Sequence, residues 1–324
     1  MKRVITWGIR YRDYESQREL FSLVAAGEIE IVAETAYIVE DPEIFGCRMA
    51  AEDAFKLNYD VIVYSGNNRD EVERCILAHG ISFNREALCT AFELSDARNK
   101  NVLIRQVEII KEIVGASDSQ IFDKGWLSEK IYTYGTYPFF KLVKRPQKGV
   151  VYSTNGILQV PDEFVDFCLY ISKLKCQNAI EIGVARGGSS YVMAALLYRN
   201  NSDLVYDMVD IEDNLVNFEE MKQLIPALNK KIPSTSADYI GKHYDFCFID
   251  ADHSYSAVME DYRNVGQYSG MVTAYHDVFG HEYDELEGGT VRGWKEIKEL
   301  ENGKEIKEFS RFPDKWMGIG VVVC

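Results

Sequence analysis

In the second half of the chain, two apolar runs are each followed by residues suited to binding a nucleoside. The segment NAIEIGVARGGSS, residues 178–190, has an apolar run broken only by Glu181 and then a turn that contains Gly183 and Gly187. Such a turn between a strand and a helix lets the backbone approach a ligand closely. The segment LVYDMVDIED reaches Asp210, 29 residues after Glu181, where a carboxylate can accept both hydroxyls of a ribose. These spacings predict a site for a cofactor that contains a nucleoside.

The residue types around the glycine turn bear on which cofactor binds. The dinucleotide fingerprint G-x-G-x-x-G is matched here by Gly183, Ala185 and Gly188, which is a near miss. Glu181 lies two residues before the first glycine, where its charge would repel a pyrophosphate and attract an ammonium. The turn therefore favours a ligand with an amino-acid-like ammonium over a nicotinamide or flavin dinucleotide.

Four segments follow one another in a recognisable order: E-x-G-x-x-x-G-G-S at residues 181–189, the run that ends at Asp210, S-A-D at 236–238, and F-I-D-A-D-H-S-Y at 248–255. Together they resemble the class I S-adenosylmethionine-dependent methyltransferases, over about residues 161–324. S-adenosylmethionine carries an ammonium and no phosphate, which agrees with Glu181. At Ala185 the chain departs from the family, since many members have glycine there. The resemblance implies a transferase of the EC 2.1.1 class.

The resemblance also implies a place for each cofactor-binding residue. Glu181, Gly183 and Gly187 would line the methionine part of the cofactor. Asp210 would hold the ribose hydroxyls, and Asp238 would lie beside the adenine. The full set implied is Glu181, Gly183, Arg186, Gly187, Ser189, Asp210, Ile211, Asp238 and Asp250.

Polar residues also follow the apolar strand predicted at residues 244–249. Asp250 and His253 come at its carboxyl end, the edge at which open α/β sheets bind ligands. Methyl transfer to an alcohol needs a base, because the alcohol keeps its proton at pH 7, and an imidazole with a pKa of about 6.5 is suited to take it. We expect Asp250 and His253 to be catalytic, with His253 as the base. Alternatively, His253 only begins a helix, since H-S-Y-S also fits a helix cap.

A second histidine and carboxylate end the strand predicted at residues 271–275. Carboxylates and imidazoles on neighbouring strand ends suit a divalent ion, and oxygen donors favour Mg²⁺ or Mn²⁺. The segments resemble those of metal-assisted O-methyltransferases, in which the metal ligands match Asp250, His276 and Asp277. The histidine departs from that oxygen-based pattern. Alternatively, Asp250 and Asp252 only contact the cofactor and helix amino termini, and His276 and Asp277 only shape the substrate pocket.

The end of the chain predicts elements that close the sheet. The acidic run GHEYDELEGGTVRGW, residues 280–294, is too long and polar for a tight hairpin and predicts a flap over the site. Trp294, Ile297 and Leu300 share one face of an amphipathic helix, and residues 319–323 form an apolar strand.

The first third of the chain alternates strand and helix patterns. Its first turn, G-I-R-Y-R-D-Y, lacks the second and third glycines that a dinucleotide needs, so residues 1–98 are predicted to be a small, degenerate, cofactor-free Rossmann-like domain. Docking, dimerisation to a homo-oligomer, substrate capture and a plain structural role all stay open for it. The predicted strands are 2–9, 29–33 and 60–65, and the predicted helices are 15–26 and 50–57.

Residues 99–160 are predicted to be a helical, aromatic-rich connector. A helix is expected at residues 99–114. The aromatic segment GWLSEKIYTYGTYPFFK then leads into a basic string. Aromatic rings beside lysines could stack on a sugar ring and neutralise a phosphate, or they could bury an interdomain seam. The string consists of Lys141, Lys144, Arg145 and Lys148.

Composition excludes several classes of function. The net charge of −15 and the pI of about 4.9 disfavour a nucleic-acid substrate, because such binding depends on lysine and arginine. The apolar runs are shorter than the roughly 20 residues that span a bilayer, so no membrane partner is expected and a cytoplasmic location is. Seven cysteines without a C-x-x-C pair suggest neither a disulfide scaffold nor a zinc knuckle.

The sequence thus predicts an α/β protein. The C-terminal half, residues 161–324, is expected to be a Rossmann-like seven-stranded methyltransferase sheet that uses S-adenosylmethionine. The acceptor is expected to be a hydroxyl of a small molecule, a sugar or nucleotide sugar. One alternative is an NAD-dependent oxidoreductase, which would keep Asp210 but which Glu181 opposes. The other is a non-catalytic Rossmann-like binding module, which the intact run at residues 250–255 opposes.

Overall fold

The computed structural model describes residues 1–10, 12–35, 42–66 and 68–324, and the chain divides into two compact units. The first unit consists of residues 1–102 and 137–156, and the second of residues 103–136 and 157–324. The longest helix, α4, runs without interruption from Ala91 to Val114. It is therefore longer than the helix predicted at residues 99–114.

The first unit is built on a parallel four-stranded sheet of order β2-β1-β3-β4. Residues of β1 and β3 are buried on both faces, as expected for the mostly apolar run VITW and the apolar run VIVY. The predicted alternation of strands and helices is confirmed. The strands are β1 (Lys2–Trp7), β2 (Ile29–Thr35), β3 (Val61–Tyr64) and β4 (Leu88–Thr90), and the helices are α1 (Tyr14–Ala25), α2 (Ala51–Ala54), α3 (Arg69–Ala78) and α7 (Phe140–Val143), with a short turn of 3₁₀ helix, η1 (Arg85–Ala87).

The second unit contains a seven-stranded sheet of order β10-β11-β9-β8-β5-β6-β7, which confirms the predicted fold class. The five strands from β9 to β7 are parallel, and β10 and β11 are antiparallel to their neighbours. The strands are β5 (Asn178–Ile182), β6 (Val205–Val209), β7 (Leu228–Lys231), β8 (Phe246–Ile249), β9 (Val272–Phe279), β10 (Glu305–Phe309) and β11 (Met317–Val323).

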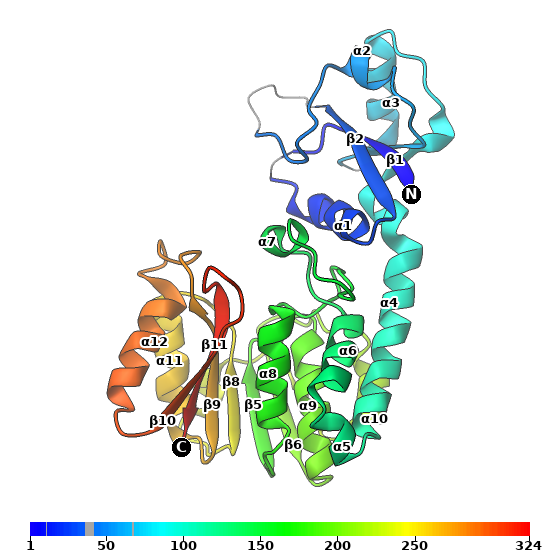
Figure 1. The fold of residues 1–324 in the computed structure, drawn as a ribbon. Helices are drawn as coiled ribbons and strands as arrows, with labels where there is room; N and C mark the ends of the chain where they lie inside the picture. Colours follow the sequence, from blue (N-terminus) through cyan, green and yellow to red (C-terminus); the bar gives the residue numbers. More distant parts are fainter. Residues whose placement is uncertain (11, 36–41, 67) are drawn as a thin grey trace. The chain divides into compact units, whose positions relative to one another are not determined.

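Helices cover both faces of this sheet (Figure 1). The strand β8 shows why: Phe246 and Phe248 enter one apolar cluster, and Cys247 and Ile249 enter the other, because successive side chains point to opposite faces. The helices are α5 (Asp118–Ile121), α6 (Lys124–Tyr134), α8 (Pro161–Ile171), α9 (Gly188–Asn200), α10 (Phe218–Leu224), α11 (Tyr255–Asn264) and α12 (Gly289–Leu300), with the 3₁₀ turns η2 (Ser236–Tyr239) and η3 (Gly266–Tyr268).

Two expectations about the end of the chain need correction. Strand β9 does not stop at residue 275 but continues through His276 and Asp277, because β11 pairs with it along this stretch, Ile319 opposite His276. The predicted flap of residues 280–294 is shorter, because helix α12 begins at Gly289. In the described part of the chain, every helix is too short or too polar to traverse a lipid bilayer.

Candidate active site

The glycine turn after β5 brings two strand ends into contact. Gly183 has a φ of +87°, and a Cβ on it would lie 2.2 Å from the carbonyl oxygen of Asp250. Gly187 has a φ of +84°, and a Cβ there would lie 2.5 Å from the ring of Tyr191. Only glycine fits such a backbone with so little space. The turn therefore lies directly against the end of β8.

Asp210 closes the same turn from the end of β6. Its Oδ2 accepts the backbone N–H groups of Val184, at 3.0 Å, and Ala185, at 2.9 Å. Ala185 has a φ of +45°, the left-handed region that glycine adopts without strain. The residue that departs from the family thus keeps the turn geometry of a glycine. Asp210, the residue expected to bind the ribose of the cofactor, is therefore held beside the turn.

Glu181 lies beneath the turn and exposes nothing to solvent. Its Oε2 accepts the hydroxyl of Tyr206 at 2.8 Å, and its Oε1 lies 3.4 Å from the hydroxyl of Ser189. Burial raises the pKa of Glu181 to about 8, in spite of the hydrogen bond from Tyr206. Ser189 lies on the same turn of chain, whereas Arg186 points to the exposed side.

Asp238 lies in η2, after β7. Its Oδ2 accepts the hydroxyl of Ser234 at 2.6 Å and the N–H of Thr235 at 3.4 Å, in a capping box. Two large apolar side chains nearby in sequence are mostly uncovered: Ile211, which follows Asp210, is 67% exposed, and Ile240 is 63% exposed. The residues expected to bind the cofactor therefore lie at or after the carboxyl ends of β5, β6, β7 and β8.

Two histidines and two aspartates meet at the ends of β8 and β9. Asp250 Oδ1 lies 3.2 Å from His276 Nδ1 and 3.4 Å from His253 Nε2. Asp277 Oδ2 lies 3.1 Å from His253 Nε2, and its Oδ1 lies 3.6 Å from His276 Nδ1. Asp277 adopts a φ of +55°, an uncommon backbone that is often found at functional sites. The structure thus brings together all four residues expected at the reaction edge.

Each residue of this cluster changes the ionisation of the others. Burial would raise the pKa of Asp250, but His276 and His253 outweigh burial and hold it well below its usual range. Burial lowers the pKa of His276, but Asp250 and Asp277 outweigh that effect and raise it to about 9. Burial raises the pKa of Asp277, with a smaller contribution from Asp250. The two carboxylates thus stabilise positive charge on the imidazoles between them.

Parts of this chain are similar to known proteins. Solved structures that are similar to part of the chain include an O-methyltransferase from Bacillus cereus in complex with S-adenosylhomocysteine, at 15% identity and a TM-score of 0.40, over 70% of this chain and 97% of that one. Another is an O-methyltransferase from Klebsiella pneumoniae, at 17% identity and a TM-score of 0.36, over 50% of this chain and 78% of that one. Curated protein sequences give no match.

A family model described as a methyltransferase domain matches residues 180–278. The match begins in β5 and ends in β9, so it includes the glycine turn, Asp210 and the four residues of the reaction edge. Residues 180–278 thus match a methyltransferase domain, within the C-terminal half for which the sequence predicted one.

The structure places two further residues, Gln159 and Tyr283, beside these four side chains. Gln159, which is 1% exposed, donates its amide N–H to Asp250 Oδ2 at 3.1 Å. Tyr283 stacks on His253, with ring centroids 4.2 Å apart and an angle of 12°, and donates its hydroxyl to Asp277. Gln159 carries no sequence signal, but Tyr283 was visible as the one aromatic residue of the acidic run at 280–288.

Three side chains in the methyltransferase domain form a candidate cation site. One ligand atom from each of Asp250, His276 and Asp277 lies within 4.8 Å of the others. Two carboxylates and one imidazole suit Mn²⁺ or Mg²⁺, and the second imidazole, His253, is held next to them. His276 Nε2 is buried without a hydrogen-bond partner, so this side chain carries a polar atom that the protein itself leaves unsatisfied.

The aromatic segment before the methyltransferase core is divided between the two units. In the second unit, Tyr134 is buried and Trp126 packs against the main apolar cluster. In the first unit, Arg18 lies over the ring of Tyr137, and Phe140 packs against Phe21 with centroids 5.6 Å apart. Most of these rings therefore serve packing within a unit, while Phe140 stays 41% exposed.

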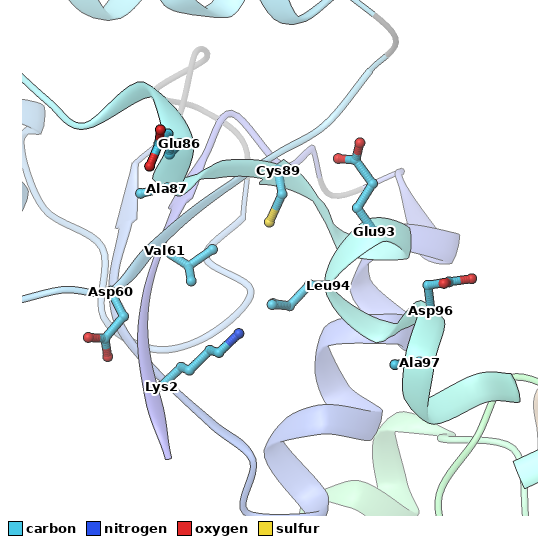
Figure 2. A pocket seen from close by; sticks show the side chains of 10 residues that line it. All are labelled: Lys2, Asp60, Val61, Glu86, Ala87, Cys89, Glu93, Leu94, Asp96 and Ala97. Carbon is cyan, nitrogen blue, oxygen red and sulfur yellow. The ribbon is translucent and has the colours of Figure 1, made fainter. Parts of the chain in front are cut away.

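A pocket of about 570 Å³ lies in the first unit (Figure 2). Lys2, Val61 and Ala87 place it at the amino ends of β1, β3 and β4. Sheets of this class bind nucleotides at the opposite, carboxyl edge, so the pocket is not at a nucleotide-binding position. Its remaining lining is Asp60, Glu86, Cys89, Glu93, Leu94, Asp96 and Ala97.

Proposed function

We propose that this protein is an O-methyltransferase that transfers the methyl group of S-adenosylmethionine to a hydroxyl of a small molecule, a sugar or nucleotide sugar. The observation that carries the proposal is the position of His253. It lies between Asp250 and Asp277, and Asp250 in turn contacts the turn at Gly183. This position supports His253 as the base, because its imidazole is held at the edge where we expect the cofactor's methyl group.

Methyl transfer requires an oxygen nucleophile that gives up its proton as the C–O bond forms and the bond from carbon to sulfur breaks. His253 can receive that proton. If its Nε2–H is donated to Asp277, its Nδ1 is the basic nitrogen, and the imidazolium that forms is stabilised by Asp250 and Asp277. Holding the acceptor oxygen in line with the methyl group contributes further, up to roughly 7 to 11 kcal/mol of the barrier.

A divalent ion fits the residues at this edge. Asp250, His276 and Asp277 would hold it through two carboxylates and one imidazole. When bound, such an ion lowers the pKa of a hydroxyl that approaches it. Gln159 would orient Asp250 through its hydrogen bond to Oδ2, and Tyr283 would orient Asp277 through the hydrogen bond from its hydroxyl.

The cofactor would bind along the carboxyl ends of β5 to β8. Asp210 offers its carboxylate to the ribose, Gly183 and Gly187 allow close approach of the backbone, and Glu181, in contact with the hydroxyl of Ser189, would lie beneath the methionine part. The adenine would lie between the apolar side chains of Ile211 and Ile240, beside Asp238, and Arg186 at the turn completes the set. Uncovered apolar side chains of this size favour a flat ligand.

The sugar acceptor is supported by the basic string. Lys141, Lys144, Arg145 and Lys148 are exposed, and the residues from 130 to 161 contain no aspartate or glutamate in a chain that has 51 of them. This local positive charge suits a phosphorylated acceptor in an otherwise acidic protein. Residues 1–98 would then form a cofactor-free domain, and a cytoplasmic location would give access to nucleotide sugars.

Two experiments test the proposal. Calorimetric titration of the metal-stripped protein with S-adenosylhomocysteine should show saturable binding, and titration with NAD should show none. Binding of NAD in place of S-adenosylhomocysteine would favour an oxidoreductase, and binding of neither would favour a non-catalytic module. Transfer of a labelled methyl group should then be measured across a panel of nucleotide sugars and a simple phenol. Label in the phenol alone would rule out the sugar acceptor.

A further inference from the structure

A buried carboxylate outside the reaction edge has no role in the chemistry described so far. Asp261, on α11, is 8% exposed, and its carboxylate accepts a hydrogen bond from the hydroxyl of Ser236. Burial raises the pKa of Asp261 to about 6. Burying an ionisable group is unfavourable unless a partner compensates it, so the contact with Ser236 accounts for the position of this side chain.

A second residue of α11 holds the same segment. The side-chain amide of Asn264 donates to the hydroxyl of Ser236 at 3.0 Å, and the backbone carbonyl of Asn264 accepts the N–H of Gly241 at 3.0 Å. Ser236 is 3% exposed, and Asp261 and Asn264 are one turn apart on α11. Together they fix both the beginning and the end of residues 236–241.

Between these two fixed points, Ala237, Asp238 and Ile240 are exposed, whereas Tyr239 is buried and anchors the segment in an apolar cluster. Asp238 is exposed, with one carboxylate oxygen, Oδ2, already bonded to Ser234 and Thr235. Its other oxygen is left to accept a donor from outside. Ile240 is 63% exposed, and so the segment offers an acceptor beside an apolar surface. That combination suits a heteroaromatic base that carries an exocyclic amine.

We propose that Asp261 and Asn264 are positioning residues that hold residues 236–241 in place for recognition of the cofactor's base. Through Ser236 they set the place of Asp238, so that its free oxygen accepts the exocyclic amine of adenine. They thereby determine the preference for adenine over a base with an oxo group at that position. The inference rests on the proposed function, in which Asp238 lies beside the adenine.

The test compares the affinity of two ligands that differ only at this amine: S-adenosylhomocysteine and S-inosylhomocysteine. Calorimetric titration of the wild-type protein should show tighter binding of the adenosyl ligand, by about tenfold, as one hydrogen bond to a charged group contributes. Asp261→Ala should reduce that preference several-fold. Asp261→Asn, which can still bond to Ser236, should restore most of it. Glu260→Ala removes an exposed carboxylate from the same turn of α11 and should leave the preference unchanged.

The outcomes separate the inference from the proposed function. If the wild-type protein binds neither ligand, the proposed function fails. If it binds both equally, or if Asp261→Ala weakens both by the same factor, Asp261 has no part in base recognition and the inference is overturned. Should Asp261→Ala not fold, as checked by circular dichroism, Asn264→Ala tests the same segment from its other contact and should also lower the preference.

Discussion

Gly183 packs so closely against Asp250 that no side chain fits at position 183, since a Cβ there would lie 2.2 Å from the carbonyl oxygen of Asp250. The carboxyl ends of β5 and β8 thereby form one continuous surface. The turn expected to hold the cofactor and the residue expected to hold the reaction groups cannot move independently.

Gly183→Ala should therefore impair both stability and cofactor binding. The added methyl group must displace the backbone of Asp250, which should lower the free energy of unfolding by about 2 kcal/mol or more. Affinity for S-adenosylhomocysteine should fall along with it. Urea unfolding and calorimetry measure the two effects. Gly303→Ala is the control, because Gly303 also has a positive φ, +101°, but has nothing within 4 Å of a new Cβ. Equal effects of the two substitutions would contradict the role of the contact.

Ala185→Gly should stabilise the protein. Ala185 has a φ of +45°, and the left-handed conformation costs a residue with a side chain about 1 kcal/mol more than glycine. Part of the gain is offset by the larger entropy of glycine in the unfolded chain. We expect a rise of up to about 1 kcal/mol in the free energy of unfolding, with unchanged affinity for S-adenosylhomocysteine. A lower melting temperature in thermal unfolding would show that the turn does not have this backbone.

His253→Ala should lower turnover and leave cofactor affinity intact. Loss of a general base reduces rates by about 10²- to 10⁴-fold. Turnover is measured with the acceptor found in the methyl-transfer panel, and affinity by titration with S-adenosylhomocysteine. His243→Ala serves as the control, since His243 is exposed and bonds to the backbone of Tyr268. Unchanged turnover in His253→Ala would refute the base role.

His276→Ala should abolish binding of Mn²⁺. It removes one of the three ligand groups, and the remaining carboxylates lose the imidazole that compensates their charge. Electron paramagnetic resonance of free Mn²⁺ in a titration measures the effect without any acceptor. His281→Ala is the matched control, because the His281 side chain is 91% exposed. If both variants bind Mn²⁺ like the wild-type protein, the ion is held elsewhere.

Glu181 should make stability depend on pH. Burial raises its pKa from 4.5 to about 8, so the folded state holds a proton that the unfolded state loses. The contribution of Glu181 is fully present below about pH 4.5 and is lost as pH rises to about 8. At 1.36 kcal/mol per pKa unit, the loss is about 5 kcal/mol at most. Glu181→Gln should remove it, whereas Glu219→Gln, an exposed glutamate on α10, should not. Urea unfolding of the three proteins between pH 5 and 8.5 decides the matter, and parallel curves would contradict the prediction.

The strands that carry the site could be predicted because their signals are local. The runs before Asp210 and Asp250 are short, apolar and followed by carboxylates, so both their type and their end can be read from the sequence. The end of β9 could not be read in this way. It continues through His276 and Asp277 because β11, more than 40 residues later, pairs with it, and a distant partner leaves no local pattern.

The contacts that orient the reaction groups could not be predicted from the sequence for a similar reason. Gln159 precedes α8 and reaches Asp250 across 91 residues of sequence. Tyr283 meets His253 only because Gly289, with a φ of +58°, lets the chain turn tightly against it. Each contact depends on tertiary packing, which cannot be read from residue types and their spacing.

The reaction groups His276 and Asp277 belong to the sheet, whereas the segment beside them does not, so selection can act on the two separately. His276 and Asp277 belong to β9, which is bonded on one side to β8 and on the other to β11, so their backbone is fixed by the sheet. Tyr283 belongs to the exposed, acidic residues 280–288, whose substitution leaves those pairings intact. Exchange of the exposed residues of this segment, with Tyr283 retained on His253, would thus change the surface beside the reaction edge while the strand pairings are preserved.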